Sequence, residues 1–454
     1  MRTKLSILCA VALAACGSDA TKHAQPDSAV PRPDSTATPP GGDGAVAVTN
    51  VDVNADLTGD TTWSKDHSYT LKKHIFVTGG TLTIEPGVRV LGEAGSSLVV
   101  TREAKIHAVG TAAAPIVFTS AKPAGQRARG DWGGLVLLGK ATINVTGGEE
   151  KIEGFAASQT GTVYGGTSDG HDCGKLRYVR IEFAGFELAP DNELNGLTVG
   201  GCGSATEIDY VQAHMGADDG VEMFGGTASL KHILITQPDD DGLDWDFGWR
   251  GKVQFLIVQQ TTTHGNYGIE ADSNKNNNDA TPRSAPELWN VSLLGSSAAP
   301  GTAGKLQGGI LFRRGTAGKL TNSLIAFFAD DAADVADAAT AAQAKSGALA
   351  ITKSVFHLNA KLAGSWPAEA KDNDGGFDES AHFTASATGN RYADPQLVSP
   401  FALGTPSFMP QPGSPVLSGG ATPPADGFFD TAATFAGAIG TTDWTAGWTA
   451  YPES

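Results

Sequence analysis

Carboxylate side chains are concentrated in the middle of this sequence. Between Glu182 and Asp279 there are seventeen Asp or Glu residues and only four Lys or Arg residues. Many of the acidic residues recur at a regular interval, since 22 residues separate Asp218 from Asp240, and Glu222 from Asp244. Such recurrence is typical of side chains stacked on successive turns of a repeat fold. The residues concerned are Asp218, Asp219, Glu222, Asp240, Asp241, Asp244, Asp246, Glu270 and Asp272.

Stacked carboxylates create an electrostatic problem that a cation would solve. Side chains on successive turns lie about 4.8 Å apart, and like charges at that distance repel one another. Either some of these groups hold a proton at neutral pH, or a cation lies between them. Calcium suits the second case because it takes six to eight oxygen ligands in flexible geometry. The sequence therefore predicts a Ca²⁺ site, and the alternative is that the Asp-Asp-Gly segments only form turns and the acids face solvent.

A second set of residues has the order expected of a glycan-cleaving site. Asp219 is followed by the pair Asp240-Asp241, then by His264 and later by Arg313. This order resembles that of polygalacturonases, which carry Asn-Thr-Asp, Asp-Asp, Gly-His-Gly and Arg-x-Lys on successive coils. The resemblance implies that the three Asp residues act as general acid and base at a glycosidic bond. It also implies that His264 tunes their protonation and that Arg313 binds a uronate. The chain departs from the pattern at Ala217-Asp218-Asp219, Thr263-His264-Gly265 and Arg313-Arg314-Gly315.

Two other chemistries stay open at this point. A polysaccharide lyase would use Ca²⁺-bound uronate and a basic residue, although no Lys or Arg is clearly placed beside the acids. His264, Glu270 and Asp272 could also bind a transition metal, but their spacing is not diagnostic. The sequence contains no Walker-type loop, no Gly-x-Ser-x-Gly elbow and no His/Cys spacing of a zinc site.

The elements that position these residues are short β-strands with a fixed repeat. Val211, Ile233 and Leu256 occupy equivalent places in three β-branched runs, at intervals of 22 and 23 residues. Each run is followed by a second short strand, in which alternation places Val221, Leu243 and Ile269 inside. The same alternation places Glu222, Asp244 and Glu270 outside. The period fits one coil of a parallel β-helix, whereas a β-propeller blade needs about 40 residues and a β-sandwich has no fixed repeat.

Several segments resemble a family of exported bacterial β-helix proteins that resemble pectin lyases. The resemblance is carried by Gly130-Asp-Trp-Gly-Gly-Leu-Val-Leu-Leu-Gly139, Leu176-Arg-Tyr-Val-Arg-Ile-Glu-Phe-Ala-Gly185 and Asp443-Trp-Thr-Ala-Gly-Trp-Thr449. It implies an all-β, right-handed parallel β-helix, which we expect over residues 47–393. It implies no particular activity.

Two segments depart from the repeat. The Ala- and Asp-rich stretch from Ala329 to Lys345 predicts a short helix on a loop. Residues 394–454 form an irregular, aromatic-rich C-terminal segment, which we expect to pack along or over the end of the β-helix because a terminal coil exposes backbone and core. A carbohydrate-stacking platform is the alternative for these aromatic side chains.

The N-terminus predicts export and lipid attachment. Residues 1–15 have the charged start and the apolar run of a signal peptide, which is too short to span a bilayer. The segment Leu13-Ala14-Ala15-Cys16 resembles the lipobox of bacterial lipoproteins, which implies cleavage before Cys16 and acylation of that cysteine. We expect residues 16–46, which are rich in Pro, Ser and Thr, to form a disordered tether. Gly17 in place of Asp favours the outer membrane over the inner one, and an ordinary cleavable signal is the alternative.

Charge and cysteine content limit the partners. The net charge is −17, and loss of Arg2 and Lys4 with the signal would make it −19, so nucleic acid should be repelled. Cys173 and Cys202, which both lie beside glycines, predict a disulfide rather than a metal site in an exported protein. We therefore expect a monomeric envelope lipoprotein whose acidic face binds a cation, a glycan or another envelope protein. A polysaccharide-active enzyme of the polygalacturonase type is the alternative.

Overall fold

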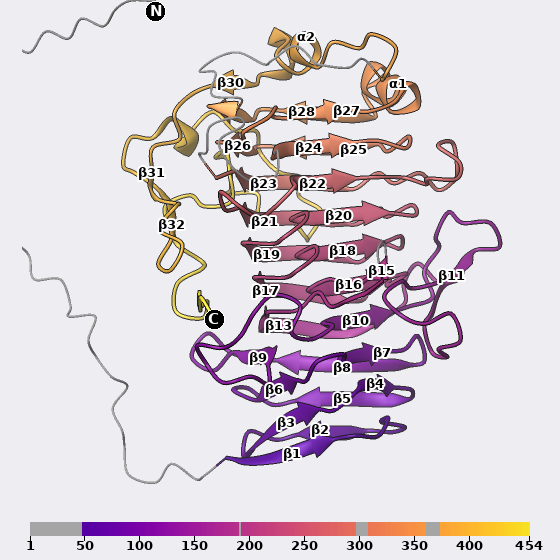
Figure 1. Cartoon of the computed structure of the whole chain (residues 1–454). Helices are drawn as coiled ribbons and strands as arrows, with labels where there is room; N and C mark the ends of the chain where they lie inside the picture. Colours follow the sequence, from indigo (N-terminus) through magenta and orange to yellow (C-terminus); the bar gives the residue numbers. More distant parts are fainter. Residues whose placement is uncertain (1–47, 190–191, 297–306, 360–372) are drawn as a thin grey trace, which may run out of the picture. The chain divides into compact units, whose positions relative to one another are not determined.

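The β-branched runs form parallel strands that stack coil upon coil (Figure 1). In this computed structural model, the described residues are 48–189, 192–296, 307–359 and 373–454, and they belong to the unit 47–454. The predicted lipidation site Cys16, the signal peptide 1–15 and the tether 16–46 lie outside the described residues. Within the described ranges, no helix is long and apolar enough to cross a membrane. The fold is the predicted right-handed parallel β-helix.

One wall of the β-helix is a short sheet of one strand per coil. Its strands pair in parallel in the order β4, β7, β10, β16, β18, β20, β22, β24 and β27. Their bounds are β4 His74–Val77, β7 Ser97–Val100, β10 Leu135–Leu138, β16 Leu197–Gly200, β18 Val221–Phe224, β20 Leu243–Asp246, β22 Tyr267–Ala271, β24 Gly308–Phe312 and β27 Asp334–Val335.

The other wall is a long sheet whose central strands are bent in the middle. In the coils on either side of the centre, the two arms of each bend are separate strands. The bounds are β1 Thr49–Val53, β2 Thr61–Trp63, β3 His67–Leu71, β5 Gly80–Ile84, β6 Arg89–Gly92, β8 Ala104–Val109, β9 Ile116–Ser120, β13 Gly174–Glu182, β17 Glu207–His214, β19 Ser229–Thr236, β21 Lys252–Gln259, β23 Glu287–Leu294, β25 Gly318–Thr321, β26 Leu324–Ala326, β28 Leu349–Thr352, β29 Val355–His357 and β30 Arg391–Tyr392.

The core lies between the two walls, and the predicted register is confirmed. Val211, Ile233 and Leu256 pair in β17, β19 and β21. Val221, Leu243 and Ile269 pair in the same way in β18, β20 and β22. All six side chains are completely buried. Burial of a side chain of this size contributes about 1.5–3 kcal/mol, so each added coil is stabilised chiefly by its inward-facing residues.

The bends of the long sheet carry a stack of aromatic rings. Tyr178, Tyr210, His232 and Phe255 each have a positive φ, between 49° and 64°, which is uncommon for residues other than glycine. Because they occupy equivalent places, their rings stack at centroid distances of 4.5, 4.2 and 4.9 Å along the series. Aromatic pairs at these distances contribute beyond their buried area. We call these four residues the bend stack.

The predicted disulfide is present. Cys173 immediately precedes β13 and Cys202 follows β16, so the bond joins the two walls. Their Cα atoms are 5.9 Å apart, and both side chains are buried in the core.

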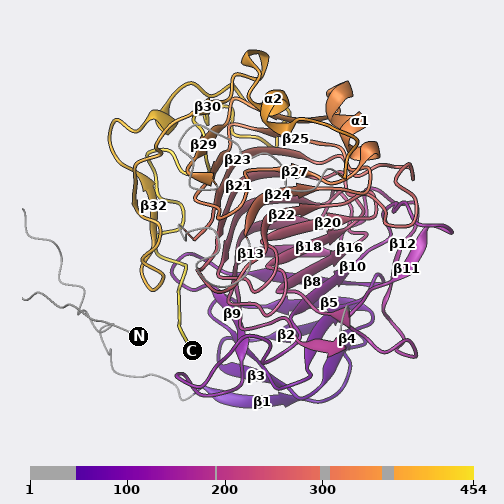
Figure 2. The same ribbon diagram turned by 45° about the horizontal axis from the view of Figure 1, so that its top comes forward.

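Two helices lie at the C-terminal end of the stack, α1 (Ala338–Ser346) and α2 (Glu379–Phe383) (Figure 2). Helix α1 is the predicted helical insertion, but it begins nine residues later than Ala329. Asp337 sets this start because its side chain accepts a hydrogen bond of 2.9 Å from the Thr340 amide. Phe383 of α2 packs on Phe312 with ring centroids 6.4 Å apart, so the helices cover the end of the core.

The aromatic C-terminal segment packs along the side of the β-helix and leaves the end to the helices. After the hairpin of β31 (Leu397–Ser399) and β32 (Ser407–Pro410), residues 419–454 run beside the long sheet without further strands or helices (Figure 1). We call residues 419–454 the strap. Side-chain amides of the β-helix bind its backbone, as when Gln212 Nε2 donates to the Ala450 carbonyl at 2.7 Å. At the end of the strap, the Gly125 amide donates to the Ser454 carbonyl at 3.0 Å.

An insertion after β10 covers the outer face of the short sheet. Residues 144–165 include the antiparallel strands β11 (Glu149–Lys151) and β12 (Val163–Gly165). Ile152 and Phe155 of this insertion pack on Phe76 and Val136, which point outward from the short sheet. The first coils of this outer face are therefore apolar and covered, and the acidic residues begin beyond them.

Candidate functional site

The predicted row of carboxylates lies on the outer face of the short sheet. Glu222, Asp244 and Glu270 are paired in register on β18, β20 and β22, as the alternation predicted. The Asp-Asp pairs lie in the turns that precede β18 and β20, and Asp246 and Asp272 lie at or just after the strand ends. We call the whole group the acidic ladder: Asp218, Asp219, Glu222, Asp240, Asp241, Asp244, Asp246, Glu270 and Asp272.

The acidic ladder is covered, so the alternative of a solvent-exposed acidic face is wrong. Asp219 is 6 % exposed, Asp241 3 % and Asp272 2 %. Glu222, Asp246 and Glu270 are also buried, and the remaining three members are half-buried. Buried carboxylates need either a proton or a positive partner, since an unpaired charge away from water is costly.

Three groups of carboxylates in the ladder are close enough to share a metal ion. In each group, oxygen atoms from three different side chains lie within 4.8 Å of one another. Asp219 belongs to two of the groups and so does Asp244, and the groups are therefore continuous along the sheet. Their members are Asp218, Asp219 and Asp240; Asp219, Glu222 and Asp244; Asp241, Asp244 and Glu270.

Burial shifts the ionisation of the ladder strongly. It raises the pKa of Asp218 and of Asp246 to about 8, and that of Glu270 to about 7. Burial, reinforced by neighbouring carboxylates, also holds the pKa of Asp219 and of Asp244 well above the usual range. The same causes raise the pKa of Glu222 and Asp241, whereas burial alone raises that of Asp272, against the effect of Arg313 and Arg314. A ladder without a cation would therefore retain protons at neutral pH.

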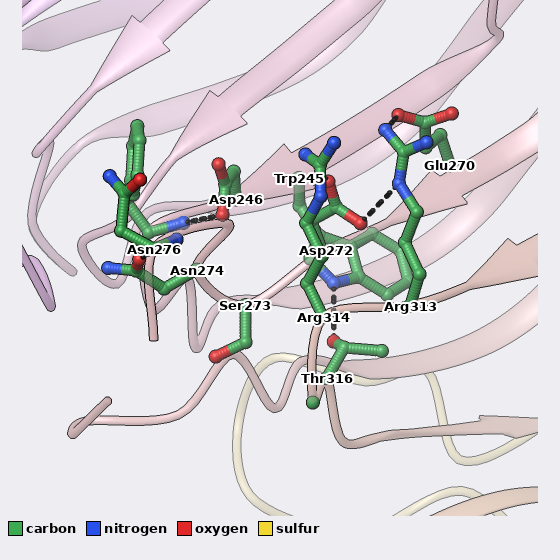
Figure 3. Close-up of polar contacts among 12 residues, drawn as sticks. Trp245, Asp246, Glu270, Asp272, Ser273, Asn274, Asn276, Arg313, Arg314 and Thr316 are labelled. Carbon is green, nitrogen blue, oxygen red and sulfur yellow. Dashed lines mark hydrogen bonds and ion pairs between the residues drawn. The ribbon is translucent and has the colours of Figure 1, made fainter. Parts of the chain in front are cut away.

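Two arginines neutralise one end of the ladder. Arg313 lies between Glu270 and Asp272: its Nε donates to Asp272 Oδ1 at 2.8 Å, and its Nη2 bonds Glu270 (Figure 3). Arg314 pairs with the other oxygen of Asp272. The predicted uronate-binding guanidinium is thus engaged by two carboxylates of its own chain.

Two of the three Asp residues predicted as general acid and base, Asp219 and Asp241, hold backbone turns in place. Asp219 Oδ1 accepts the backbone amide of Asp241 at 2.8 Å, and Asp241 Oδ1 accepts the amide of Tyr267 at 2.5 Å. Each of these carboxylates therefore braces the turn of the next coil with one of its oxygen atoms. Asp240 shares the first carboxylate group with Asp218 and Asp219.

His264 lies in the turn that precedes β22. Its Nδ1 is 2.8 Å from Thr263 Oγ1, and its Nε2 is 3.9 Å from Asp239 Oδ1. The side chain is 39 % exposed. Among the described residues, the candidate metal-binding groups contain carboxylates only, so the predicted set of His264, Glu270 and Asp272 is not one of them.

Two residues of the site were missing from the sequence prediction. Asn195 Nδ2 donates to Glu222 Oε2 at 2.5 Å, while the buried Asn195 Oδ1 has no hydrogen-bond partner among the described atoms. Asn195-Gly196 occupies the place of Asp219-Gly220 one coil earlier, so extending the repeat backwards would have found it. Glu153 reaches Glu222 from the insertion 144–165, and burial raises the pKa of Glu153 to about 7. No repeat relates Glu153 to the ladder.

These residues offer the ligand atoms that Ca²⁺ prefers. Carboxylate oxygens from adjacent coils converge, and the unpartnered amide oxygen of Asn195 belongs to a side chain that already contacts Glu222. Calcium accepts both kinds of oxygen at 2.3–2.6 Å in irregular geometry. Ligands for zinc or copper, which favour His and Cys, are not gathered here.

Comparison with known proteins agrees with this fold. The model of a pectate-lyase-like β-helix domain matches residues 55–449. No curated protein and no solved structure matches the chain significantly. Because the matched region extends over most of the described chain, this protein belongs to the family of pectate-lyase-like β-helix domains.

Proposed function

We propose that this protein is a Ca²⁺-binding β-helix of the bacterial cell envelope, with a structural or binding role. The observation that carries the proposal is the set of three overlapping carboxylate groups in the acidic ladder. Without a cation, the members of these groups that no arginine neutralises must take up protons or repel one another. A divalent ion would replace the protons and join strands β18, β20 and β22 from outside.

Binding is favoured over polysaccharide cleavage by what the candidate catalytic groups already do. Asp219 and Asp241 brace backbone turns, and Arg313 is held by Glu270 and Asp272. A general acid and base need room for a glycosidic bond and a water molecule between them. The insertion 144–165 and the buried state of the ladder favour an enclosed ion over an open substrate cleft.

The location in the envelope rests on the N-terminal sequence. We infer that Cys16 is acylated and anchors the protein to the outer membrane, with residues 16–46 as a tether. The partners would then be the membrane, through lipid, and an envelope glycan or protein. Metabolic labelling with a radioactive fatty acid tests this anchor: the wild-type protein should be labelled, and Cys16→Ser should abolish both the label and the membrane association.

Calorimetric titration of the metal-free protein with Ca²⁺ tests the ion site. We expect binding with a rise in melting temperature, because a ligand that binds only the folded state at 100 times its Kd stabilises by about 2.7 kcal/mol. The double variant Glu222→Gln/Asp244→Asn should lose both effects. Asp279→Asn, which removes an exposed carboxylate outside the ladder, is the matched control. Absence of heat and of any thermal shift at millimolar Ca²⁺ would end the proposal.

A further inference from the structure

A cavity of about 570 Å³ lies on a different wall of the β-helix from the acidic ladder. It is bounded by strands β17, β19 and β21 of the long sheet and by the strap at Gly427 and Phe428. This volume is within the range of small-molecule sites, which is about 300–1,000 Å³.

The cavity collects the rare basic residues of this part of the chain. Of the four Lys or Arg residues between positions 182 and 279, three line it: Lys231, Arg250 and Lys252. Ser229 and Lys252 occupy paired positions on β19 and β21, and Lys231 lies two residues beyond Ser229, so both ammonium groups point outward on adjacent coils. In a chain with a net charge of −17, such a grouping needs an explanation.

Most charges around the cavity are already paired. Its two acidic lining residues bind cations outside it, since Glu207 lies 3.1 Å from Lys175, and Asp209 bonds His232 at 2.7 Å and lies 3.9 Å from Arg177. Two of the three basic residues that line the cavity, Arg250 and Lys252, likewise form ion pairs with carboxylates outside the cavity.

Those two pairs are Arg250 with Asp169, at 3.3 Å, and Lys252 with Asp426, at 2.5 Å. Lys231 is different: within the described ranges, no carboxylate lies within ion-pair distance of its ammonium group. Its contacts are the Phe428 carbonyl at 2.7 Å and the face of the Phe428 ring at 5.4 Å. The half-buried ammonium group of Lys231 therefore faces the cavity without an ion pair among the described residues, although Asp209 is its register partner on β17.

The rest of the lining suits a sugar ring. Ser229 accepts the amide of Lys252 at 3.1 Å and keeps its hydroxyl hydrogen for a ligand. Thr227 donates to the Asp169 carbonyl at 2.6 Å and keeps its oxygen as an acceptor. Hydroxyl groups beside an aromatic ring and a cation match the hydroxyls, the apolar ring face and the acidic group of an acidic sugar.

We propose that this cavity binds an anionic saccharide, with its carboxylate or sulfate group on Lys231 and its hydroxyls on Ser229 and Thr227. The site is separate from the acidic ladder and does not require Ca²⁺. It would give the envelope protein a docking point for acidic glycan chains that the ladder itself would repel.

Three monosaccharides that differ only at carbon 6 test the proposal: D-glucuronate, D-glucose 6-sulfate and D-glucose. Binding to the full protein is measured by ligand-observed NMR at low salt with a chelator present, which removes any contribution of Ca²⁺. We expect millimolar affinity for at least one anionic sugar. We expect glucose to bind at least tenfold more weakly.

Two variants separate the charge from the cavity. Lys231→Gln retains a donor for the Phe428 carbonyl but removes the charge, and it should weaken the anionic sugar at least tenfold. Ser204→Trp, at an exposed lining position, should block the sugar without changing any charge. Lys275→Gln, an exposed lysine outside the cavity, should leave binding unchanged.

Binding of only one anionic sugar would identify the group that Lys231 prefers. Equal binding of glucose and the anionic sugars, or failure of all three to bind the wild type, would overturn the proposal. An affinity that Lys231→Gln leaves unchanged would overturn it as well. None of these results would affect the Ca²⁺ site, because the titration is made without the ion.

Discussion

Asp219 and Asp241, which occupy equivalent turns of adjacent coils, are joined by a hydrogen bond of 2.8 Å from the backbone amide of Asp241 to Asp219 Oδ1. The carboxylate of one coil thus supports the backbone of the next. The same carboxylate belongs to two of the three candidate Ca²⁺ groups. Its structural and its ion-binding roles can be separated by substitution.

Asp219→Asn should retain the hydrogen bond to the Asp241 amide and abolish Ca²⁺ binding. The amide oxygen still accepts the Asp241 amide, and the side chain is neutral without having to take up a proton. In a chelator we therefore expect the free energy of unfolding to be unchanged or higher, as measured by urea denaturation. Asp219→Ala should lower it by about 1–3 kcal/mol because a buried amide loses its partner. If Asn is as damaging as Ala, the charge itself must be stabilising.

Removal of Arg313 should leave two buried carboxylates without their strongest partner. Arg313→Met is expected to lower the free energy of unfolding by about 3–5 kcal/mol at neutral pH. Adding Glu270→Gln and Asp272→Asn to that variant should restore most of the loss, because no buried charge then remains unpaired. Thermal and urea denaturation of the single and triple variants measure this. A triple variant that is no more stable than Arg313→Met would contradict the pairing.

Stability without Ca²⁺ should fall as the pH rises. Folding raises the pKa of Asp218 and Asp246 to about 8, and of Glu153 and Glu270 to about 7. In the unfolded chain, such groups have a pKa of about 4. The folded state therefore binds more protons, and the stability they contribute is complete below about pH 4 and is lost as the pH rises through about 7 to 8.

Melting temperatures measured between about pH 5 and about pH 8 check this direction. In a chelator, the melting temperature should decrease over that interval. In millimolar Ca²⁺ the decrease should be smaller, since the ion takes the place of the protons. A melting temperature that rises with pH in the chelator would show that the ladder is ionised in the folded protein.

Loss of Trp448 should release part of the strap. Its side chain is 2 % exposed and contacts Tyr178 and Tyr210 of the bend stack edge-on, at 5.8 and 6.0 Å. Trp448→Ala is expected to cost about 3–5 kcal/mol and to increase protease cleavage after residue 440. Val398→Ala, at a side chain that is 53 % exposed, should have little effect. Equal protease resistance of both variants would mean that the strap is held mainly by its backbone contacts.

The repeat could be predicted from the sequence because inward and outward residues alternate strictly. The 22- and 23-residue spacing alone predicts that Val211, Ile233 and Leu256 are in register, and it predicts the stacking of Glu222, Asp244 and Glu270 as well. Both depend only on the period of the strands, which local sequence encodes.

The covering of the ladder could not be predicted in that way. Glu153 comes from an insertion about 70 residues before Glu222, and Arg313 follows Glu270 by 43 residues. Neither contact obeys the repeat, so only the folded chain brings them together. The alternation of the strands predicts only that the acidic ladder points away from the core. Whether another segment covers it depends on these non-repeating contacts, and in the structure the ladder is buried.

The bend stack was also beyond the sequence prediction. A positive φ is usually predicted at glycine or asparagine, whereas these positions are occupied by Tyr178, Tyr210 and His232. Two tertiary contacts accompany this conformation: the rings stack on one another, and the strap packs against them, with Trp444 at 5.3 Å from His232.

The strap follows every coil in the sequence, and this order has a consequence for biosynthesis. Since chains are made from the N-terminus and fold in that order, the coils can form before the strap exists. Until then the bend stack and the side-chain amides of Gln212, Gln254 and Asn290 have no cover from this segment. Before the strap is made, the aromatic side chains on this flank of the β-helix are therefore exposed and prone to self-association. They are covered once the last residues are made and Ser454 contacts Gly125.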